Sequence, residues 1–266
     1  MRRFETYSVM VTGGAHGIGE ATARRFAAEG AAVLIADLDG EAGRAVAASI
    51  GESGGRAEAL VCDVADSGAV RAAVAFAAEA FGGLDVLVNN AYACSDFRED
   101  FADELDDDWT RDLDVCLVGS MRCSRAAMPY LKAAGGRGSI VNVGSVNGIS
   151  FFGNHSYSAA KAALMSLTRT LSVQAGPDRV RVNLVAPGTI RTRAWEGRED
   201  SLAAAARGYP LGRVGEPADI AAAITFLAST DAAWITGVTL PVEGGILNSN
   251  NSFQQMLSDE VSAAAE

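Results

Sequence analysis

The sequence predicts an α/β domain with a parallel sheet that is covered by helices on both faces. Seven short runs of β-branched and apolar residues have the length of strands. Between them lie alanine-rich stretches in which apolar residues recur at helical spacing. Strands that alternate with helices favour βαβ units and therefore a doubly wound parallel sheet. No linker-like segment divides the sequence, so we expect one domain.

The predicted elements follow one another from the N-terminus onward. Gly30 is a natural stop for the first helix. Residues 193–213 fit the alternation poorly, since they mix charges, an alanine-rich helical turn and a Tyr-Pro pair, and we expect a lid outside the sheet. The domain should cover residues 1–246, and the polar tail 247–266 should fray or dock on a partner subunit. The strand candidates are 8–11, 32–36, 59–61, 85–88, 139–143, 180–185 and 238–241; the helix candidates include 18–29, 70–81, 109–132, 157–175 and 217–228.

The composition excludes several classes of protein. The 22 Lys and Arg against 33 Asp and Glu give a net charge of −11, which excludes an electrostatic nucleic-acid binder and disfavours a membrane-surface protein. Charges interrupt every long apolar stretch before the roughly 18 residues that a membrane span needs. The first ten residues contain no apolar run of secretory length. We therefore expect a cytoplasmic protein.

Cysteine and histidine usage argues against a disulfide scaffold and against a metal site. The cysteines form no C-x-x-C pair, and the two histidines are far apart in the sequence. We expect free, buried thiols. The four cysteines are Cys62, Cys94, Cys116 and Cys123.

A glycine-rich turn, TGGAHGIG at residues 12–19, directly follows the first strand and opens the first helix. Glycine at positions 13, 17 and 19 permits φ > 0 and lets backbone N–H groups approach a pyrophosphate at the positive end of the helix. The spacing differs from the common G-x-G-x-x-G fingerprint. An ordinary tight βα turn therefore stays open as the alternative for this motif alone.

Asp37 strengthens the case for a dinucleotide. It ends the second strand, 20 residues after Gly17, where a carboxylate would accept both hydroxyls of an adenosine ribose. The same carboxylate would repel a 2′-phosphate, residues 31–43 contain no Lys or Arg to receive one, and a histidine such as His16 is mostly neutral at pH 7. The sequence therefore favours NAD over NADP. A solvated acid is the alternative for Asp37 alone, and Asp39 could be one.

Tyr157 and Lys161 form the candidate catalytic pair. They stand at i and i+4 in HSYSAAKAAL, so a helix places them on one face. A phenol is a poor acid or base at neutral pH, but a neighbouring ammonium stabilises phenolate, which makes Tyr157 a plausible general base. Lys161 is one of only two lysines among the 22 basic residues, and its compact ammonium could also reach a ribose hydroxyl. An accidental surface pair is the alternative.

Ser145 stands where ligands bind in open α/β sheets. It follows the fifth strand in SIVNVGS, at the carboxyl edge, and its hydroxyl can donate to a carbonyl oxygen. A serine in a strand-end loop is by itself usually a turn residue, so only the neighbouring motifs favour a catalytic role.

Together these motifs resemble the short-chain dehydrogenase/reductase family, over about residues 7–246. The resemblance implies a Rossmann fold with seven parallel strands. It also implies hydride transfer between nicotinamide C4 and the carbon of a secondary alcohol or ketone, with Tyr157 moving the proton and Ser145 steadying the oxygen. In the family, the helices around 109–132 and 157–175 would pair between subunits of a homotetramer. The matching motifs are TGGAHGIG, Asp37, CDV at 62–64, NNA at 89–91, Ser145, YSAAK at 157–161 and PGTIRT at 187–192.

The resemblance also assigns contacts with the cofactor. Asp63 and Val64 would contact adenine. Asn89 and Ala91 would line the adenosine ribose and the pyrophosphate. Lys161 would hold the nicotinamide ribose, and residues 187–192 would flank the nicotinamide. The full set of expected cofactor contacts is Gly13, His16, Gly17, Ile18, Gly19, Asp37, Leu38, Asp63, Val64, Asn89, Ala91, Tyr157, Lys161, Pro187, Gly188, Ile190 and Thr192.

Two positions depart from the family pattern. The family usually has asparagine in the helix after the fourth strand, where it supports a water-linked proton relay to the active-site lysine; here the residue is Cys116, and a thiol is a weak hydrogen-bonding substitute. We expect Cys116 to lie among the catalytic residues, with a backbone carbonyl and water completing the relay. Tyr92 replaces the glycine that the family prefers after NNA, and its ring would narrow the mouth near the nicotinamide or pack outside it.

The residues next to these motifs suggest the substrate. Four candidates are aromatic carbocycles, which favours an apolar or cyclic alcohol or ketone, although loop packing of the two phenylalanines and a surface role for His155 stay open. An acyl carrier protein is less expected, since such carriers are acidic and so is this chain. NAD favours the oxidative direction. The candidate substrate residues are Tyr92, Asn147, Phe151, Phe152, Asn154, His155 and Trp195.

Two further functions stay open at this point. A catalytically weak NAD-binding regulator would bind cofactor without turning over any alcohol, and Cys116 and Tyr92 motivate it. A structural α/β domain without a ligand is disfavoured by Asp37 and the glycine-rich turn. The favoured hypothesis is an NAD-dependent dehydrogenase with Ser145, Tyr157, Lys161 and Cys116 at its catalytic centre.

Overall fold

The computed structural model, which describes residues 2–249, confirms the predicted seven-stranded parallel sheet. The strand order is β3-β2-β1-β4-β5-β6-β7, so the order reverses between β1 and β4, where open α/β sheets bind ligands at the carboxyl ends of the strands. The strands are β1 (Ser8–Thr12), β2 (Ala32–Asp37), β3 (Arg56–Val61), β4 (Val86–Asn89), β5 (Ser139–Val143), β6 (Arg181–Pro187) and β7 (Thr239–Val242).

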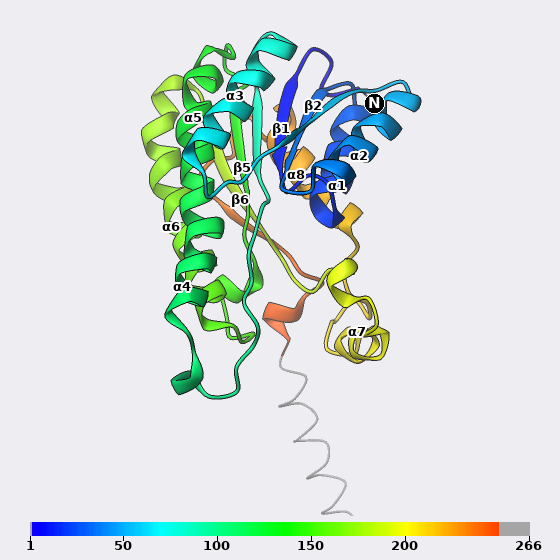
Figure 1. The fold of residues 1–266 in the computed structure, drawn as a ribbon, viewed down its shortest axis with the longest axis vertical. Helices are drawn as coiled ribbons and strands as arrows, with labels where there is room; N and C mark the ends of the chain where they lie inside the picture. The colour runs from blue at the N-terminus through cyan, green and yellow to red at the C-terminus, as the bar shows by residue number, and fades with distance from the viewer. Residues whose placement is uncertain (1, 250–266) are drawn as a thin grey trace, which may run out of the picture.

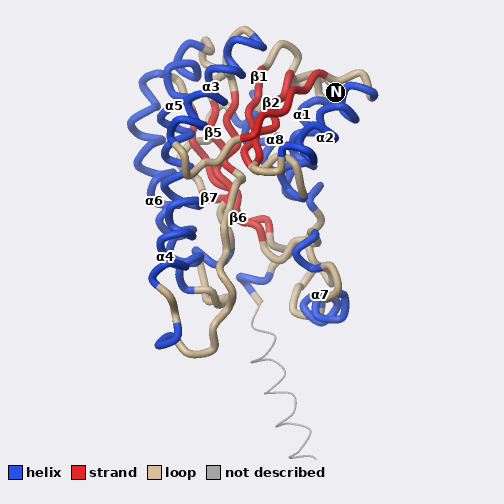
Figure 2. The backbone as a smooth tube through the Cα atoms, viewed as in Figure 1, coloured by secondary structure: helices blue, strands red, loops and turns tan. Residues whose placement is uncertain are grey.

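Helices cover both faces of the sheet, as Figure 2 shows. Val9 and Val11 of β1 point to a core under α1, α2 and α8, whereas Met10 points to a core under α3 and α5. This alternation is the period of two that a strand buried on both faces requires. The helices are α1 (Gly17–Ala28), α2 (Gly40–Glu52), α3 (Ser67–Phe81), α4 (Asp106–Leu113), α5 (Ser120–Ala133), α6 (His155–Ala175), α7 (Glu199–Ala206) and α8 (Pro217–Ala228).

The structure differs from the sequence expectations in three places. The helix expected at 109–132 is divided, because a π-helical turn, Asp114–Gly119, joins α4 to α5. Helix α2 was not among the candidates, and Asp39 is its N-cap: the carboxylate accepts the Ala42 N–H at 3.0 Å. Cys94 is exposed, whereas the other three free thiols are buried as expected.

The lid expected at residues 193–213 contains a short helical turn, Arg193–Trp195, and helix α7, which lies well away from the helices beside the sheet (Figure 1). Its core is formed by Leu202, Tyr209 and Val214. The expectation that the tail 247–266 frays or docks on a partner subunit concerns mainly residues outside the described range, 2–249. Among residues 2–249, no helix is long and apolar enough to cross a membrane.

Candidate active site

The turn between β1 and α1 is shaped for close approach of a phosphate. Gly13 and Gly17 have φ of +60° and +52°, conformations that L side chains rarely adopt. A Cβ on Gly19 would lie 2.0 Å from the Gly13 carbonyl oxygen. Asn90, which the sequence reasoning missed, holds the turn by donating to the carbonyl oxygens of Thr12 and Gly13 at 3.0 and 2.8 Å. The turn therefore presents the amino end of α1 on a rigid backbone, as dinucleotide binding requires.

Asp37 lies at the end of β2, beside this turn. Its Oδ2 accepts the Ala15 N–H at 2.9 Å and its Oδ1 accepts the Asp39 N–H at 3.0 Å. These bonds fix the carboxylate at the sheet edge, where ribose hydroxyls would reach it. The neighbouring Leu38 is exposed, as a residue that covers a flat ligand would be before binding.

His16 connects the glycine-rich turn to both Asp39 and the lid. Its Nε2 lies 2.9 Å from Asp39 Oδ2 and 2.9 Å from Arg193 Nη1. The backbone N–H of Ala42 and the His16 ring lower the pKa of the Asp39 carboxyl. Through this one nitrogen His16 can either donate to Asp39 or accept from Arg193, and the tautomer of the ring decides which.

The residues expected around the adenosine differ in what their side chains do. Val64 is buried and packs against Gly119, and Asp63 Oδ1 accepts the Ala65 N–H at 2.8 Å. The Asn89 amide is turned away from the glycine-rich turn, toward α5 and β5, and donates to Ser124 Oγ and Asn142 Oδ1 at 3.1 and 2.8 Å. A contact of Asn89 with a cofactor would therefore come from its main chain.

The segment after β6 is tied to the lid and lies beside the glycine-rich turn. The Thr189 N–H donates to the hydroxyl of Tyr209 at 2.6 Å, which ties this segment to the lid. Ile190 is buried and pairs with Gly215 in an isolated bridge. The Thr192 methyl group packs beside Gly17, where an added Cβ would lie 3.2 Å from it. Of the expected cofactor contacts in this segment, Thr192 lies beside the glycine-rich turn, whereas Gly188 lies against Tyr209 and Glu243.

Lys161 and Tyr157 come together on α6. The Lys161 ammonium donates to the Val143 carbonyl at 2.8 Å and lies 5.4 Å from the centre of the Tyr157 ring. Burial lowers the pKa of Lys161, whose side chain is almost fully enclosed. Burial also raises the pKa of the Tyr157 phenol well above its ordinary value, and the hydrogen bond from Ser145 opposes this rise. Burial is therefore the largest influence on the pKa of this phenol.

Ser145 lies directly after β5 and is oriented by Asn147. Its hydroxyl donates to Asn147 Oδ1 at 3.0 Å and accepts the Asn147 N–H at 3.2 Å. The Asn147 amide in turn donates to the Gly153 carbonyl at 3.1 Å. Asn147 therefore positions Ser145 and the loop that precedes α6.

Cys116 lies in the π-helical turn, fully buried. Its thiol donates to the Ala93 carbonyl at 3.2 Å, and its own carbonyl accepts the Ser120 hydroxyl at 2.8 Å. The π-helical turn packs against α6, the helix that carries Tyr157 and Lys161. Single π turns occur often at functional sites.

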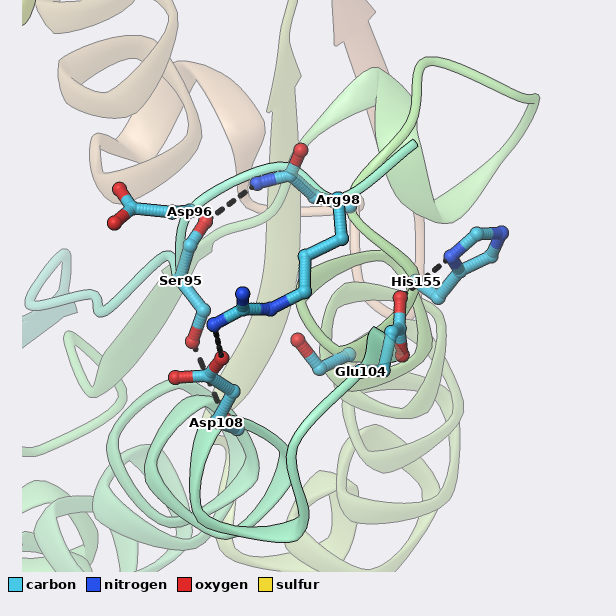
Figure 3. Close-up of a pocket in the computed structure, with 8 residues that line it drawn as sticks. Ser95, Asp96, Arg98, Glu104, Asp108 and His155 are labelled. Carbon is cyan, nitrogen blue, oxygen red and sulfur yellow. Dashed lines mark hydrogen bonds and ion pairs between the residues drawn. The ribbon is translucent and has the colours of Figure 1, made fainter. Parts of the chain in front are cut away.

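The loop after β4 is held against α4 and α6 by a polar network (Figure 3). The Ser95 N–H and hydroxyl donate to the buried Asp112 carboxylate at 3.1 and 3.0 Å, and Ser156 donates to the same carboxylate at 2.7 Å. The Asn154 amide donates to the Ser95 carbonyl at 2.8 Å. His155 Nδ1 lies 2.7 Å from Glu104 Oε1, so this histidine binds the loop.

Aromatic rings lie on the loops that flank Tyr157, and Tyr92, Phe97, Phe151 and Phe152 among them are exposed. The Tyr92 ring packs edge to face on the Tyr157 ring, with 6.5 Å between centres. Phe97, which the sequence reasoning missed, packs against Gly153 in the loop that carries Phe151 and Phe152. Trp195 belongs to the lid and contacts Arg198.

Comparison with known proteins identifies the family. Residues 13–247 match the family described as enoyl-(acyl carrier protein) reductase. The short-chain reductase protein NovJ of Streptomyces niveus is 42% identical, with 89% of this chain and 92% of NovJ covered. The meso-2,3-butanediol dehydrogenase of Serratia marcescens and the trans-4-hydroxycyclohexanecarboxylate dehydrogenase of Sinomonas cyclohexanicum are each 40% identical; both matches cover 91% of this chain, with 95% and 93% of the relatives covered.

A solved structure agrees with these relatives. The crystal structure of gox2181 superposes with a TM-score of 0.88 at 31% identity, over 93% of this chain and 98% of that one. The match to the family covers most of the chain, and it includes the glycine-rich turn, Ser145, Tyr157 and Lys161. The chain belongs to the short-chain dehydrogenase/reductase family of oxidoreductases.

Proposed function

We propose that this protein is an NAD-dependent dehydrogenase of secondary alcohols, with Tyr157 as its general acid and base. The observation that carries the proposal is the convergence of Ser145, Tyr157 and Lys161 at the carboxyl edge of the sheet, beside a glycine-rich turn and Asp37. Dehydrogenases of butanediol and of hydroxycyclohexanecarboxylate among the relatives support action on a CH–OH group.

Ser145, Tyr157 and Lys161 have separate roles in the proposed reaction. When bound, the dinucleotide supplies the nicotinamide C4 that takes the hydride from the carbinol carbon. Ser145 would hold the substrate oxygen with the hydroxyl that now donates to Asn147. Tyr157 would accept the alcohol proton, and the Lys161 ammonium, held by the Val143 carbonyl, would stabilise the phenolate that precedes this transfer.

NAD is the proposed cofactor because of Asp37. The carboxylate is fixed by two backbone N–H groups at the end of β2, and a 2′-phosphate there would meet its negative charge. The backbone of the glycine-rich turn fits a pyrophosphate, since Gly13 and Gly17 adopt positive φ at the amino end of α1.

An apolar or cyclic alcohol is the proposed substrate class. Tyr92, Phe97, Phe151 and Phe152 expose large parts of their rings around the loops that flank Tyr157. Such rings favour contact with hydrocarbon surface over contact with a polyhydroxylated sugar. A relative that acts on a hydroxylated cyclohexane ring supports this class.

The test is NADH formation at saturating NAD across a panel of steroids, cyclic diols, acyclic diols and sugars. Tyr157→Phe is the matched control, because it removes one hydroxyl and retains the ring. We expect turnover of cyclic alcohols, its loss in Tyr157→Phe, and unchanged NAD affinity by calorimetry. A preference for sugars would refute the apolar substrate. NAD binding without turnover of any alcohol would favour the regulator instead.

The proposed assembly and compartment follow from the family and from the surface. A homotetramer would pair α5 and α6 between subunits, and α6 exposes Val173. Four unpaired thiols suit a reducing compartment such as the cytoplasm. Sedimentation equilibrium would contradict the assembly if it gave a monomer.

A further inference from the structure

A second cavity lies at the edge of the sheet opposite to the catalytic groups. Its volume is about 510 Å³, within the range of small-molecule sites. Its walls come from the amino ends of the strands: Tyr7 precedes β1, Arg181 begins β6, and Thr236 precedes β7. Because all strands are parallel, this edge is separated from Ser145 and Tyr157 by the full length of the sheet.

Three arginines line this cavity in a chain of net charge −11. Arg137 pairs with Asp85 at 2.9 Å and lies 4.9 Å from the centre of the Tyr7 ring. Arg181 donates to the carbonyl oxygens of Ala228 and Ser229 at the end of α8. The third arginine, Arg179, differs from these two because its guanidinium has no partner among residues 2–249.

The guanidinium of Arg179 is available to bind a ligand. Its guanidinium forms no hydrogen bond or ion pair with residues 2–249, and the adjacent Asp178 is already paired with Lys132 at 2.7 Å. The planar fork of an arginine suits bidentate binding of a carboxylate, sulfonate or phosphate.

The remaining lining combines apolar and aromatic residues with the hydroxyl side chains of Ser229, Thr230 and Thr236. Trp234 is 100% exposed, which is unusual for the residue with the largest apolar surface. Ala233 and Val180 line the cavity beside it. The Tyr7 hydroxyl, which makes no hydrogen bond within the described chain, offers one further polar contact at the cavity wall.

We propose that this cavity binds a flat apolar anion, with its ring system against Trp234 and its acidic group on Arg179. A ring that stacks on the indole would cover apolar surface, and the anion would meet the one guanidinium of the cavity that has no protein acceptor. The site takes its ligand independently of the dinucleotide, since the two lie at opposite edges of the sheet.

The probe is naphthalene-2-sulfonate, titrated by calorimetry into the full-length protein saturated with NAD. Naphthalene-2-carboxylate and 2-naphthyl phosphate separate the acidic groups, and neutral 2-naphthalenemethanol tests the need for charge. We expect the anions to bind at least tenfold more tightly than the alcohol. Arg179→Gln and Trp234→Ala should each weaken the anions at least fivefold, whereas Arg71→Gln on the exposed face of α3 should not.

Several results would overturn this proposal. These are no heat from any anion at millimolar concentration, unchanged affinity in both cavity variants, or displacement of the probe by NAD. Loss of a defined oligomer in Trp234→Ala, measured by sedimentation, would assign Trp234 to an interface between subunits and would also refute it. Both substituted side chains are exposed, so the variants should retain the melting temperature of the parent, which thermal unfolding would verify.

Discussion

Asp112 allows a quantitative test of how the loop after β4 is held in place. Its carboxylate is 0% exposed and accepts hydrogen bonds from the Ser95 N–H, the Ser95 hydroxyl and the Ser156 hydroxyl. Asp112→Ala removes both acceptor oxygens and with them all three hydrogen bonds. The Ser95 hydroxyl can still donate to the Asp108 carbonyl at 3.4 Å, so two buried donors, the Ser95 N–H and the Ser156 hydroxyl, lose their partner.

The expected cost follows from those two donors. An unsatisfied buried donor costs about 1–3 kcal/mol, so Asp112→Ala should lower the free energy of unfolding by about 3 kcal/mol after the saved desolvation of the carboxylate is allowed for. For a chain of this length, that corresponds to a fall of roughly 6–12 °C in melting temperature. Asp112→Asn should cost only about 1 kcal/mol, because its oxygen can still accept from Ser95 and Ser156 while its amide donates to the Ser95 hydroxyl.

The assay is urea unfolding followed by circular dichroism at fixed protein concentration, with steady-state kinetics on the same preparations. Because Ser156 adjoins Tyr157 and Ser95 anchors the loop, KM in Asp112→Ala should rise more than kcat falls. A change of less than 0.5 kcal/mol in Asp112→Ala, or equal effects of Ala and Asn, would refute the reasoning from unsatisfied donors.

Three further outcomes are expected. Asp37→Ala should weaken NAD binding about tenfold or more and reduce the preference for NAD over NADP, as calorimetry with both dinucleotides would show. Burial raises the pKa of Tyr157, so kcat/KM for alcohol oxidation should rise with pH as phenolate forms; Ser145→Ala removes the hydrogen bond that lowers this pKa and should move the ascending limb to higher pH. Cys116→Asn should change kcat less than tenfold, because the Cys116 carbonyl persists in the variant; an increase by orders of magnitude would show that the thiol impairs the relay.

The sequence predicted the sheet well because each strand is a short apolar run between helices. It was less successful with α2, whose sequence contains Gly40, Gly43 and Gly51, residues of low helix propensity. Packing of Val46 and Ile50 against the sheet stabilises that helix, and a local pattern does not reveal such packing.

Other features depend on the three-dimensional arrangement of the chain. The π turn at Cys116 adds one residue to a helical turn and leaves the pattern of apolar residues intact. The helical spacing of these residues therefore predicted one continuous helix across the turn. Asn89 and Asn90 are adjacent but point to opposite sides, because side chains alternate along an extended strand. That alternation was the available signal for assigning Asn90, rather than the Asn89 amide, to the glycine-rich turn. Phe97 lies in an acidic loop with no periodicity to indicate its packing.

The carboxyl edge of the sheet is stabilised by buried side chains that form hydrogen bonds with the backbone of the loops there. Asn90 donates to the Gly13 carbonyl, Asp112 accepts from the Ser95 N–H, Tyr209 accepts from the Thr189 N–H, and Cys116 donates to the Ala93 carbonyl. Each bond satisfies a backbone group that would otherwise be costly to bury, and each fixes a loop at the carboxyl edge of the sheet. Substitutions at these supports should therefore act on affinity and KM, whereas substitutions at Tyr157 should act on kcat. The separation of the two effects distinguishes residues that hold the site from those that perform its chemistry.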